Sequence, residues 1–277
     1  MTPHQHPGLR PNPAFSPARV AALVLRYWYL LRSSTARLIE LAYWPTVNML
    51  LWGFMTQFLA TQTSYVANAF GILLSGVLLW EVLFRSQLGV SICFFEEVWS
   101  RNLGHLFVSP LRPYEMAIAL GTMSLIRTIV GVAPCMILAT WFFGWSVAAL
   151  GISFGLFVAL LMVMGWAIGF VICGLVMRYG QGVESLAWGL IFAFTPLSGV
   201  YYPISVLPSW LQPLSLALPS AHVFEGMRAI LADGVIRYDH LAAAMALDVV
   251  YIGIGVVSFL LFFRQARQRG LLLQQGE

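Results

Sequence analysis

Long apolar runs alternate with short polar segments along most of the chain. Six runs are long enough to cross a bilayer as a helix, which takes ~20 residues. They lie at residues 38–60, 66–94, 115–142, 147–176, 185–205 and 240–263. The pattern predicts an all-α polytopic membrane protein whose membrane domain, residues 34–263, has six transmembrane helices.

The segment before the first run, residues 15–33, has apolar side chains at helical spacing, at positions 20, 23, 24, 27, 28 and 31. Arginines occur between these positions. The spacing predicts an interfacial amphipathic helix with its aromatic face toward the acyl chains and its arginines toward lipid phosphate. Such a helix either anchors the first span or has a mechanical role. The proline-rich residues 1–14 are predicted to be disordered.

The fifth apolar run ends in a region that prolines interrupt. Pro203, Pro208 and Pro219 divide an otherwise apolar stretch into pieces too short to cross a membrane. Two short helices are predicted there, at 207–217 and 220–232, the second with Ser220 as its N-cap. Irregular backbone at membrane depth needs shielding by protein or a wet cavity. Residues 203–232 are therefore expected to form a re-entrant or surface-lying pair of helices on the outer side.

Composition agrees with a membrane protein. Hydrophobic residues make up 60% of the chain, charged residues only 9%, and the mean hydropathy is +0.81. A water-soluble globule needs more polar surface than this. All 15 basic residues are arginines, and eleven of them lie before the first span, in alternate loops or after the last span. The excess places both termini, including the tail 264–277, in the cytoplasm, and it forms no patch that would bind nucleic acid.

One of the arginine-bearing loops is a short charged segment between the second and third spans. We call this segment, residues 96–115, the elbow. It lies on the cytoplasmic side by the arginine count. Charge density in so short a connection is typical of a place where a soluble partner acts on a membrane protein.

Glu81, Arg85 and Arg127 are ionisable residues that fall inside the apolar runs. Each costs roughly 2.5–3.5 kcal/mol at the bilayer centre if it is unpaired. Glu81 and Arg85 are four residues apart and share one helix face, so they are expected to pair with each other or with Arg127. Two interpretations remain open, a polar lining or gate of a translocation path, and a structural ion pair between spans.

Other chemistry is weakly supported. Cys93, Cys135 and Cys173 have no CxxC spacing, so they are expected to be packing residues in a chain without a disulfide framework or metal site. No cleavable signal peptide is expected. The absence of lysine excludes a phosphate-binding loop of the GxxxxGK[ST] type.

A second class of function is an intramembrane serine protease of the rhomboid type. Residues 151–155 match G-x-S-x-G, so Ser153 and His222 are its candidate nucleophile and base. Glycines at 151, 155, 165 and 169 are better explained by close helix packing. A passive channel or scaffold is a third class, but it gives no reason for the elbow.

Two motifs resemble one family closely. The first is the sequence from Leu106 to Leu111, followed by Glu115; the second runs from Leu197 to Pro203 and continues through 207–211, 218–219 and 222–228. Both are similar to the permease subunits of ABC type-2 exporters, a group that includes polysaccharide, nodulation-factor, lipid and drug exporters. One departure is Arg101-Asn102, where many members have Gly-Thr.

The resemblance implies an ATP-driven exporter of the bacterial inner membrane. It implies a soluble ATPase subunit that binds ATP and Mg, a second permease copy, no cofactor in this chain, and an amphiphilic substrate that is lipid-like or saccharide-linked. Residues 15–33 become the interface helix, and a coupling helix lies within 96–112. The expected coupling residues are Glu96, Glu97, Arg101, Leu103, Leu106, Ser109, Pro110 and Leu111. The expected path or gate residues are Glu81, Arg85, Arg127, Tyr201, Tyr202 and Pro203.

Overall fold

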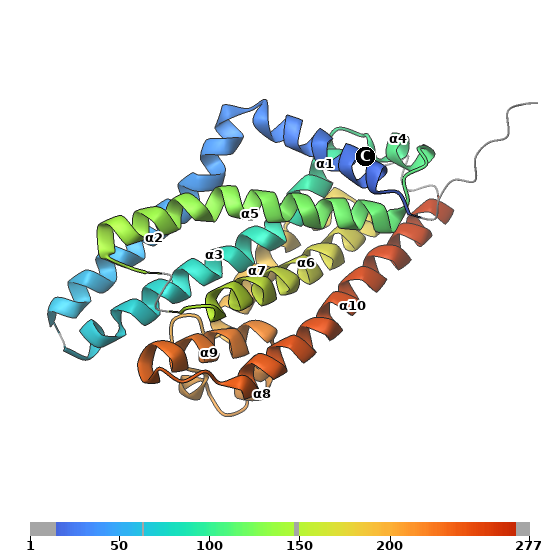
Figure 1. Ribbon diagram of the computed structural model, residues 1–277. Helices are drawn as coiled ribbons and strands as arrows, with labels where there is room; N and C mark the ends of the chain where they lie inside the picture. Colours follow the sequence, from blue (N-terminus) through green and yellow to red (C-terminus); the bar gives the residue numbers. More distant parts are fainter. Residues whose placement is uncertain (1–14, 63, 147–149, 270–277) are drawn as a thin grey trace, which may run out of the picture.

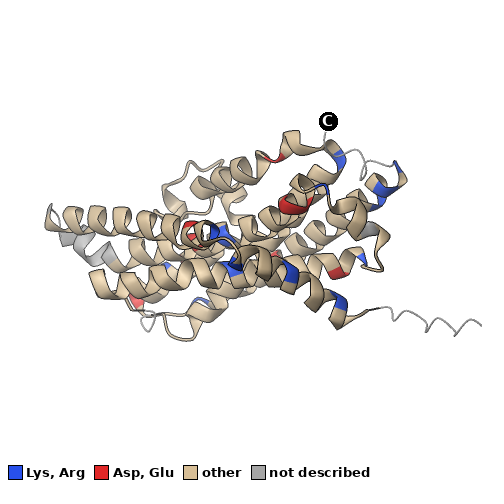
Figure 2. Ribbon diagram, turned by 90° about the horizontal axis from the view of Figure 1, so that it is seen from above, with Lys and Arg blue, Asp and Glu red and all other residues tan. Residues whose placement is uncertain are grey.

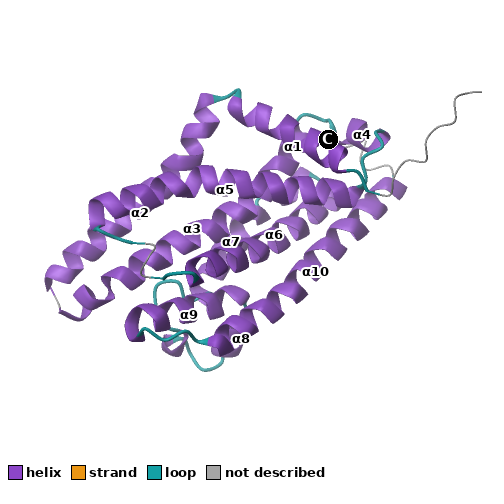
Figure 3. Ribbon diagram, in the orientation of Figure 1, coloured by secondary structure: helices purple, strands orange, loops and turns teal. Residues whose placement is uncertain are grey.

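The computed structural model describes residues 15–62, 64–146 and 150–269, and the predicted disordered tail 1–14 lies outside them. Within these ranges the chain is helical and contains no strand. The long helices lie side by side in one bundle (Figure 1). The loops lie at the ends of the helices (Figure 3). The long helices are α2 (Thr35–Gln62), α3 (Ser64–Trp99), α5 (Pro113–Phe143), α6 (Ser153–Tyr179) and α10 (Tyr238–Gln268).

Four helices in the described ranges are both long and apolar enough to cross a membrane, Gly71–Trp99, Pro113–Phe143, Ser153–Tyr179 and Tyr238–Gln268. This confirms a polytopic helical membrane protein. The other two predicted spans correspond to α2 and to α7 (Leu186–Leu197), which do not meet both criteria. α7 ends well before the predicted residue 205.

Helix α3 lies at the centre of the bundle and contacts α2, α5 and α6, while α10 packs along α6. Small residues set these close approaches. A Cβ added at Gly169 would lie 2.8 Å from the Cβ of Val90 on α3, and one at Gly255 would lie 2.7 Å from the carbonyl oxygen of Ala167. The packing explanation of the glycines therefore holds at 165 and 169.

The packing explanation is wrong for Gly151 and Gly155, where an added Cβ would meet nothing within 4 Å. Gly151 instead has φ +56°, a turn conformation that glycine adopts without a side-chain penalty. The G-x-S-x-G match thus arises at the start of α6 from a turn and an open position.

Helix α1 (Pro17–Arg32) crosses one end of the bundle beside α4 (Leu103–Val108) and the C-terminal end of α10 (Figure 1). Figure 2 shows that charged positions gather in this half of the molecule. The face of α1 that carries Leu23, Tyr27 and Leu31 is buried against the bundle. Its arginines Arg19 and Arg26 pair with carboxylates of the bundle, so the predicted orientation toward lipid phosphate is wrong for them.

At the opposite end, η3 (Ile204–Val206), α8 (Gln212–Leu216) and α9 (Pro219–Asp233) follow α7. The predicted N-cap of the second short helix is wrong, because Leu218 is the N-cap and Pro219 occupies the first turn. The Ser220 hydroxyl instead lies 2.7 Å from that of Ser198, and both side chains are buried.

The end of α7 is held by side chains from α9. Gly199 has φ +64°, which ends the helix. Arg228 donates to the carbonyl oxygens of Gly199 and Tyr202, the latter at 2.6 Å. Glu225 accepts a hydrogen bond from the Ile204 backbone N–H at 2.8 Å. Backbone groups that the break leaves without helical partners are therefore satisfied by α9.

Candidate functional site

The elbow contains three elements. α3 ends at Trp99, the short helix α4 spans Leu103–Val108, and α5 begins at Pro113. The turn before α4 is made by Arg101, whose φ is +51°. This is the left-handed region that glycine adopts most easily. Many ABC type-2 permeases have glycine at the position of Arg101. This chain thus keeps a glycine-like backbone there but carries an arginine side chain.

The side chains of α4 and its C-terminal flank divide into a buried and an exposed set. Leu103 is 2% exposed and belongs to the core, while Leu106 and Leu111 are partly buried against it. In contrast, Val108 is 88% exposed, and His105, Ser109 and Pro110 are exposed beside it. The elbow is therefore anchored on one side and presents an exposed apolar residue on the other.

Glu97, in the last turn of α3, joins the elbow to α1. Its side chain is buried. One carboxylate oxygen lies 2.6 Å from Arg26 Nη1 and the other accepts from Asn102 Nδ2 at 2.7 Å. Because α1, α3 and the start of α4 meet at this carboxylate, the elbow is fixed relative to α1.

Glu115, in the first turn of α5, is a second attachment point and is fully buried. Arg19 donates to it from Nε and Nη2 at 2.8 and 2.6 Å. The backbone N–H groups of Ser16 and Arg112 donate to it at 2.8 and 3.0 Å. The same carboxylate therefore caps α5 and holds the beginning of α1.

The titration behaviour of α1 follows from these contacts. The hydrogen bonds from Arg19 to Glu115 raise the pKa of the guanidinium, so Arg19 stays charged. Burial raises the pKa of the Tyr27 phenol well above its usual range, so Tyr27 stays neutral.

Glu96 joins three helices through one oxygen. Its Oε1 atom accepts from Arg37 Nη1 of α2 at 3.2 Å and from Arg127 Nη2 of α5 at 3.0 Å. The adjacent residues Glu96 and Glu97 therefore point to different helices, and both are occupied by contacts within the chain. Arg127 is engaged here and does not pair with Glu81.

Deeper in the bundle, Arg85 Nε lies 3.6 Å from Glu81 Oε2, so the predicted pair is present. Asn48 of α2 donates to the other oxygen, Glu81 Oε1, at 2.7 Å. Asn48 was not among the predicted site residues, because it is uncharged and nothing in the apolar run 38–60 distinguishes it from the other neutral polar residues there. Glu81 is thus shared between α2 and α3.

The remaining predicted path residues lie toward the opposite end. Tyr201 stacks on Trp52 of α2, with ring centroids 4.5 Å apart and 15° between the planes. Tyr202 donates from its hydroxyl to the Pro196 carbonyl oxygen at 2.8 Å. Pro203 is exposed. Within residues 15–62, 64–146 and 150–269, no hydrogen bond or ion pair joins any of these three residues to Arg85.

The geometry gives no support to the protease. His222 lies 3.0 Å from His240, Nδ1 to Nδ1, and its Nε2 lies 2.9 Å from the Leu216 carbonyl oxygen. In the described part of the chain no hydrogen bond joins His222 to Ser153. Among the same residues, no group of three metal-ligating side chains is found.

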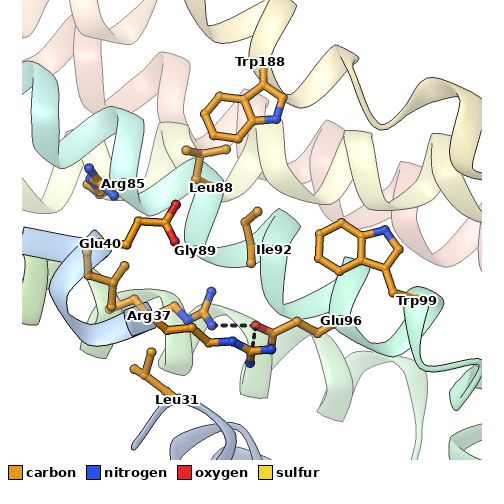
Figure 4. A pocket seen from close by; sticks show the side chains of 12 residues that line it. Leu31, Arg37, Glu40, Arg85, Leu88, Gly89, Ile92, Glu96, Trp99 and Trp188 are labelled. Atoms are coloured by element: carbon orange, nitrogen blue, oxygen red, sulfur yellow. Dashed lines mark hydrogen bonds and ion pairs between the residues drawn. The ribbon is translucent and has the colours of Figure 1, made fainter. Parts of the chain in front are cut away.

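A cleft of about 270 Å³ opens between α2, α3, α5 and α7 on the side of the elbow. Figure 4 shows Glu40 directed into it and Trp188 and Trp99 at its borders, with Arg37 bonded to Glu96. We refer to this space as the cleft. Its lining consists of Leu31, Arg37, Glu40, Leu41, Arg85, Leu88, Gly89, Ile92, Glu96, Trp99, Arg127 and Trp188.

Comparison with known proteins agrees with this architecture. The profile of the ABC-2 type transporter family matches residues 24–232. Over 117 residues the chain is 30% identical to the capsule polysaccharide export inner-membrane protein BexB of Haemophilus influenzae. The matched region covers 41% of this chain and 43% of that relative. Since the family match extends over most of the chain, from α1 to α9, the protein belongs to the ABC-2 type transporter family.

Proposed function

We propose that this chain is the permease subunit of an ATP-driven exporter, and that a separate ATPase subunit docks on the elbow. The observation that carries the proposal is an exposed apolar residue on a fixed frame. Val108 is 88% exposed on α4, while Glu97 and Glu115 hold the flanks of α4 to α1. A soluble partner that covers Val108 gains apolar contact and acts on a rigid element.

The proposed mechanism uses this rigidity. ATP and Mg are bound by the partner, and ATP binding closes two ATPase subunits below a permease dimer. Their displacement moves α4 and, through the ends of α3 and α5, the bundle above it. The permease then changes between inward and outward access. We propose an amphiphilic substrate that is lipid-like or saccharide-linked, and the match to BexB, a capsule polysaccharide export inner-membrane protein, supports the saccharide-linked form.

The proposed membrane topology has six spans and both termini in the cytoplasm. α2 has 28 residues, about 42 Å of helix, which exceeds a hydrocarbon core of about 30 Å. α7 has 12 residues, about 18 Å, so the fifth span needs the broken segment after it to reach the outer surface. We propose that this segment and α8 and α9 form a re-entrant structure.

Replacing Val108 with aspartate is expected to uncouple the ATPase. When the ATPase docks, a carboxylate at this position loses its water and gains no opposite charge in return. Stimulation of ATP hydrolysis by the permease should therefore fall about tenfold, equivalent to about 1.4 kcal/mol of docking energy. The measurement is ATP hydrolysis and co-purification of the reconstituted complex. Leu103 is unsuited to this test, because its burial makes a charge there a folding defect.

The matched control is Ile152→Asp, which changes an equally exposed apolar residue, 93% exposed, in the connection before α6 at the opposite end of the bundle. It should leave ATP hydrolysis unchanged. Equal stimulation by wild type and the Val108→Asp variant, with both proteins folded, would exclude the elbow as the docking site.

The topology is tested by cysteines at exposed serines. Ser209→Cys, between η3 and α8, should react with a membrane-impermeant thiol reagent from the outer side of intact cells. Ser100→Cys, at the elbow, should react only after the inner face is opened. Both serines are exposed, and the native cysteines are buried. Reversed labelling would overturn the arginine-based orientation. Ser220 is unsuitable because it is buried.

A further inference from the structure

The cleft extends from the elbow deep into the bundle. Trp99 marks one end of it at the end of α3, and Arg85 lines it fourteen residues earlier on the same helix. Fourteen residues of α-helix span about 21 Å, roughly two thirds of a hydrocarbon core. The cleft thus leads from the charged end of the protein to a cation at membrane depth.

Among the buried charges along the cleft, Arg85 is the least satisfied. Arg85 is 8% exposed, and its ion pair with Glu81 is long at 3.6 Å. Nε has no hydrogen-bond partner, because the contact with Glu81 at 3.6 Å is longer than a hydrogen bond. A guanidinium has five N–H donors. Several donors of Arg85 therefore remain for a ligand in the cleft.

The other charges of the lining are largely committed. Three arginines and two glutamates line the cleft. Glu96 is occupied by Arg37 and Arg127, so its negative charge is balanced locally. Figure 4 shows Glu40 with its carboxylate directed into the cleft, on the side of Arg85. Glu40 is the charge that opposes an anion there.

Apolar side chains complete the lining, which includes Leu41, Leu88 and Ile92 together with the rings of Trp99 and Trp188. A small inorganic anion would leave this apolar surface uncovered. An amphiphile would cover it with its alkyl chain while its head group reached Arg85.

We propose that the cleft is the entry site for the oxyanion head group, a phosphate or a carboxylate, of an amphiphile, with Arg85 as the group that binds it. Guanidinium binds such oxyanions through paired N–H donors. The proposal rests on the proposed export function, because the site would receive the substrate before ATP binding switches the permease from inward to outward access. Glu40 opposes entry and so limits how tightly the head group is held.

Thiol reaction rates test the charge preference of the cleft. The probe position is Ile92→Cys in a chain whose three native cysteines are replaced by alanine. It reacts with sulfonatoethyl methanethiosulfonate, an anion, or with trimethylammonioethyl methanethiosulfonate, a cation. The ratio of the two rates, relative to a free thiol, should favour the anion. Ile92 is seven residues from Arg85, about 10 Å along α3, so Arg85→Gln should lower the ratio about tenfold.

Three variants sharpen the result. Glu40→Gln should raise the ratio, and Arg85→Lys should keep it. Arg178→Gln should leave it unchanged, because Arg178 lies over the rings of Tyr179 and Phe262 and does not line the cleft. If Arg85→Gln folds poorly, the double variant Glu81→Gln/Arg85→Gln, which removes both buried charges, is compared with wild type and should also have a lower ratio. An unchanged ratio in these comparisons overturns the role of Arg85.

Protection identifies the source of the anion. Dodecyl phosphate should slow the reaction at Ile92→Cys, and this protection should be lost with Arg85→Gln. Inorganic phosphate, dodecyl maltoside and dodecyltrimethylammonium should not protect. Equal protection by inorganic phosphate would indicate a site for a free anion, and equal protection by the neutral or cationic detergent would indicate apolar binding only; either outcome overturns the proposal. Because the permease alone is used, failure here leaves the docking test at Val108 unaffected.

Discussion

The Glu115→Ala variant is expected to lose most of its folded yield. Four hydrogen bonds converge on this buried carboxylate, two from Arg19 and one each from the Ser16 and Arg112 backbone N–H groups. Alanine removes the acceptor of all four hydrogen bonds, and it also removes the cap of α5. The measurement is the fraction of monodisperse protein after extraction and the melting temperature in detergent.

Graded variants separate the contributions at this attachment point. Arg19→Gln removes the guanidinium bonds but keeps both backbone bonds, so its melting temperature should lie between those of wild type and the Glu115→Ala variant. Glu115→Gln keeps one acceptor oxygen and should also be intermediate. A Glu115→Ala protein as stable as wild type would show that α1 is held by its apolar face alone.

The second large effect is expected at Glu81 and Arg85. Either single change, Glu81→Gln or Arg85→Gln, leaves a buried charge without its partner, at a cost of roughly 3–5 kcal/mol. The double change removes both charges, so folded yield should recover relative to either single variant. A double-mutant cycle on melting temperature and yield should give a coupling energy of roughly 1–3 kcal/mol.

Additive losses in this cycle would show that the 3.6 Å contact contributes no coupling and that each charge depends on another partner, as Asn48 is for Glu81. The ratio of anionic to cationic reagent rates at Ile92→Cys is an independent measurement on the same variants. This ratio should stay low in the double variant even where folded yield recovers. The double change removes the unpaired buried charge, but it does not restore the positive charge of Arg85.

Helix positions were largely predictable, because the bilayer sets a minimum length for an apolar run. The predicted span 240–263 lies within the helix Tyr238–Gln268, and 115–142 nearly equals Pro113–Phe143. In the fifth run the helix ends at Leu197, earlier than the predicted residue 205, because the apolar run continues past the helix end. Gly199 ends the helix with its positive φ, but the same run also contains Gly189 inside the helix, so a glycine alone does not identify the helix end.

Partner choice was not predictable. The spacing of α1 identifies Arg19 as a polar position, but its acceptor Glu115 is 96 residues away in the sequence. Arg37 and Glu96 are 59 residues apart. Helix periodicity constrains which face a side chain occupies and not which distant helix packs there. For this reason the sequence indicates Glu96 and Glu97 as coupling residues but does not reveal that their carboxylates bind arginines of this chain.

The hydrogen bonds that join Arg228 and Glu225 of α9 to the segment after α7 limit how the outer end of the molecule is able to move. Unravelling residues 199–204 would strip Arg228 of its two carbonyl acceptors and Glu225 of the Ile204 N–H, and groups of this kind are costly to leave unsatisfied when buried. If residues 199–204 and α9 move together as one unit, every one of these hydrogen bonds is kept. Residues 234–237, with Gly234 at φ +69°, join this unit to α10 and are the place where a hinge costs least.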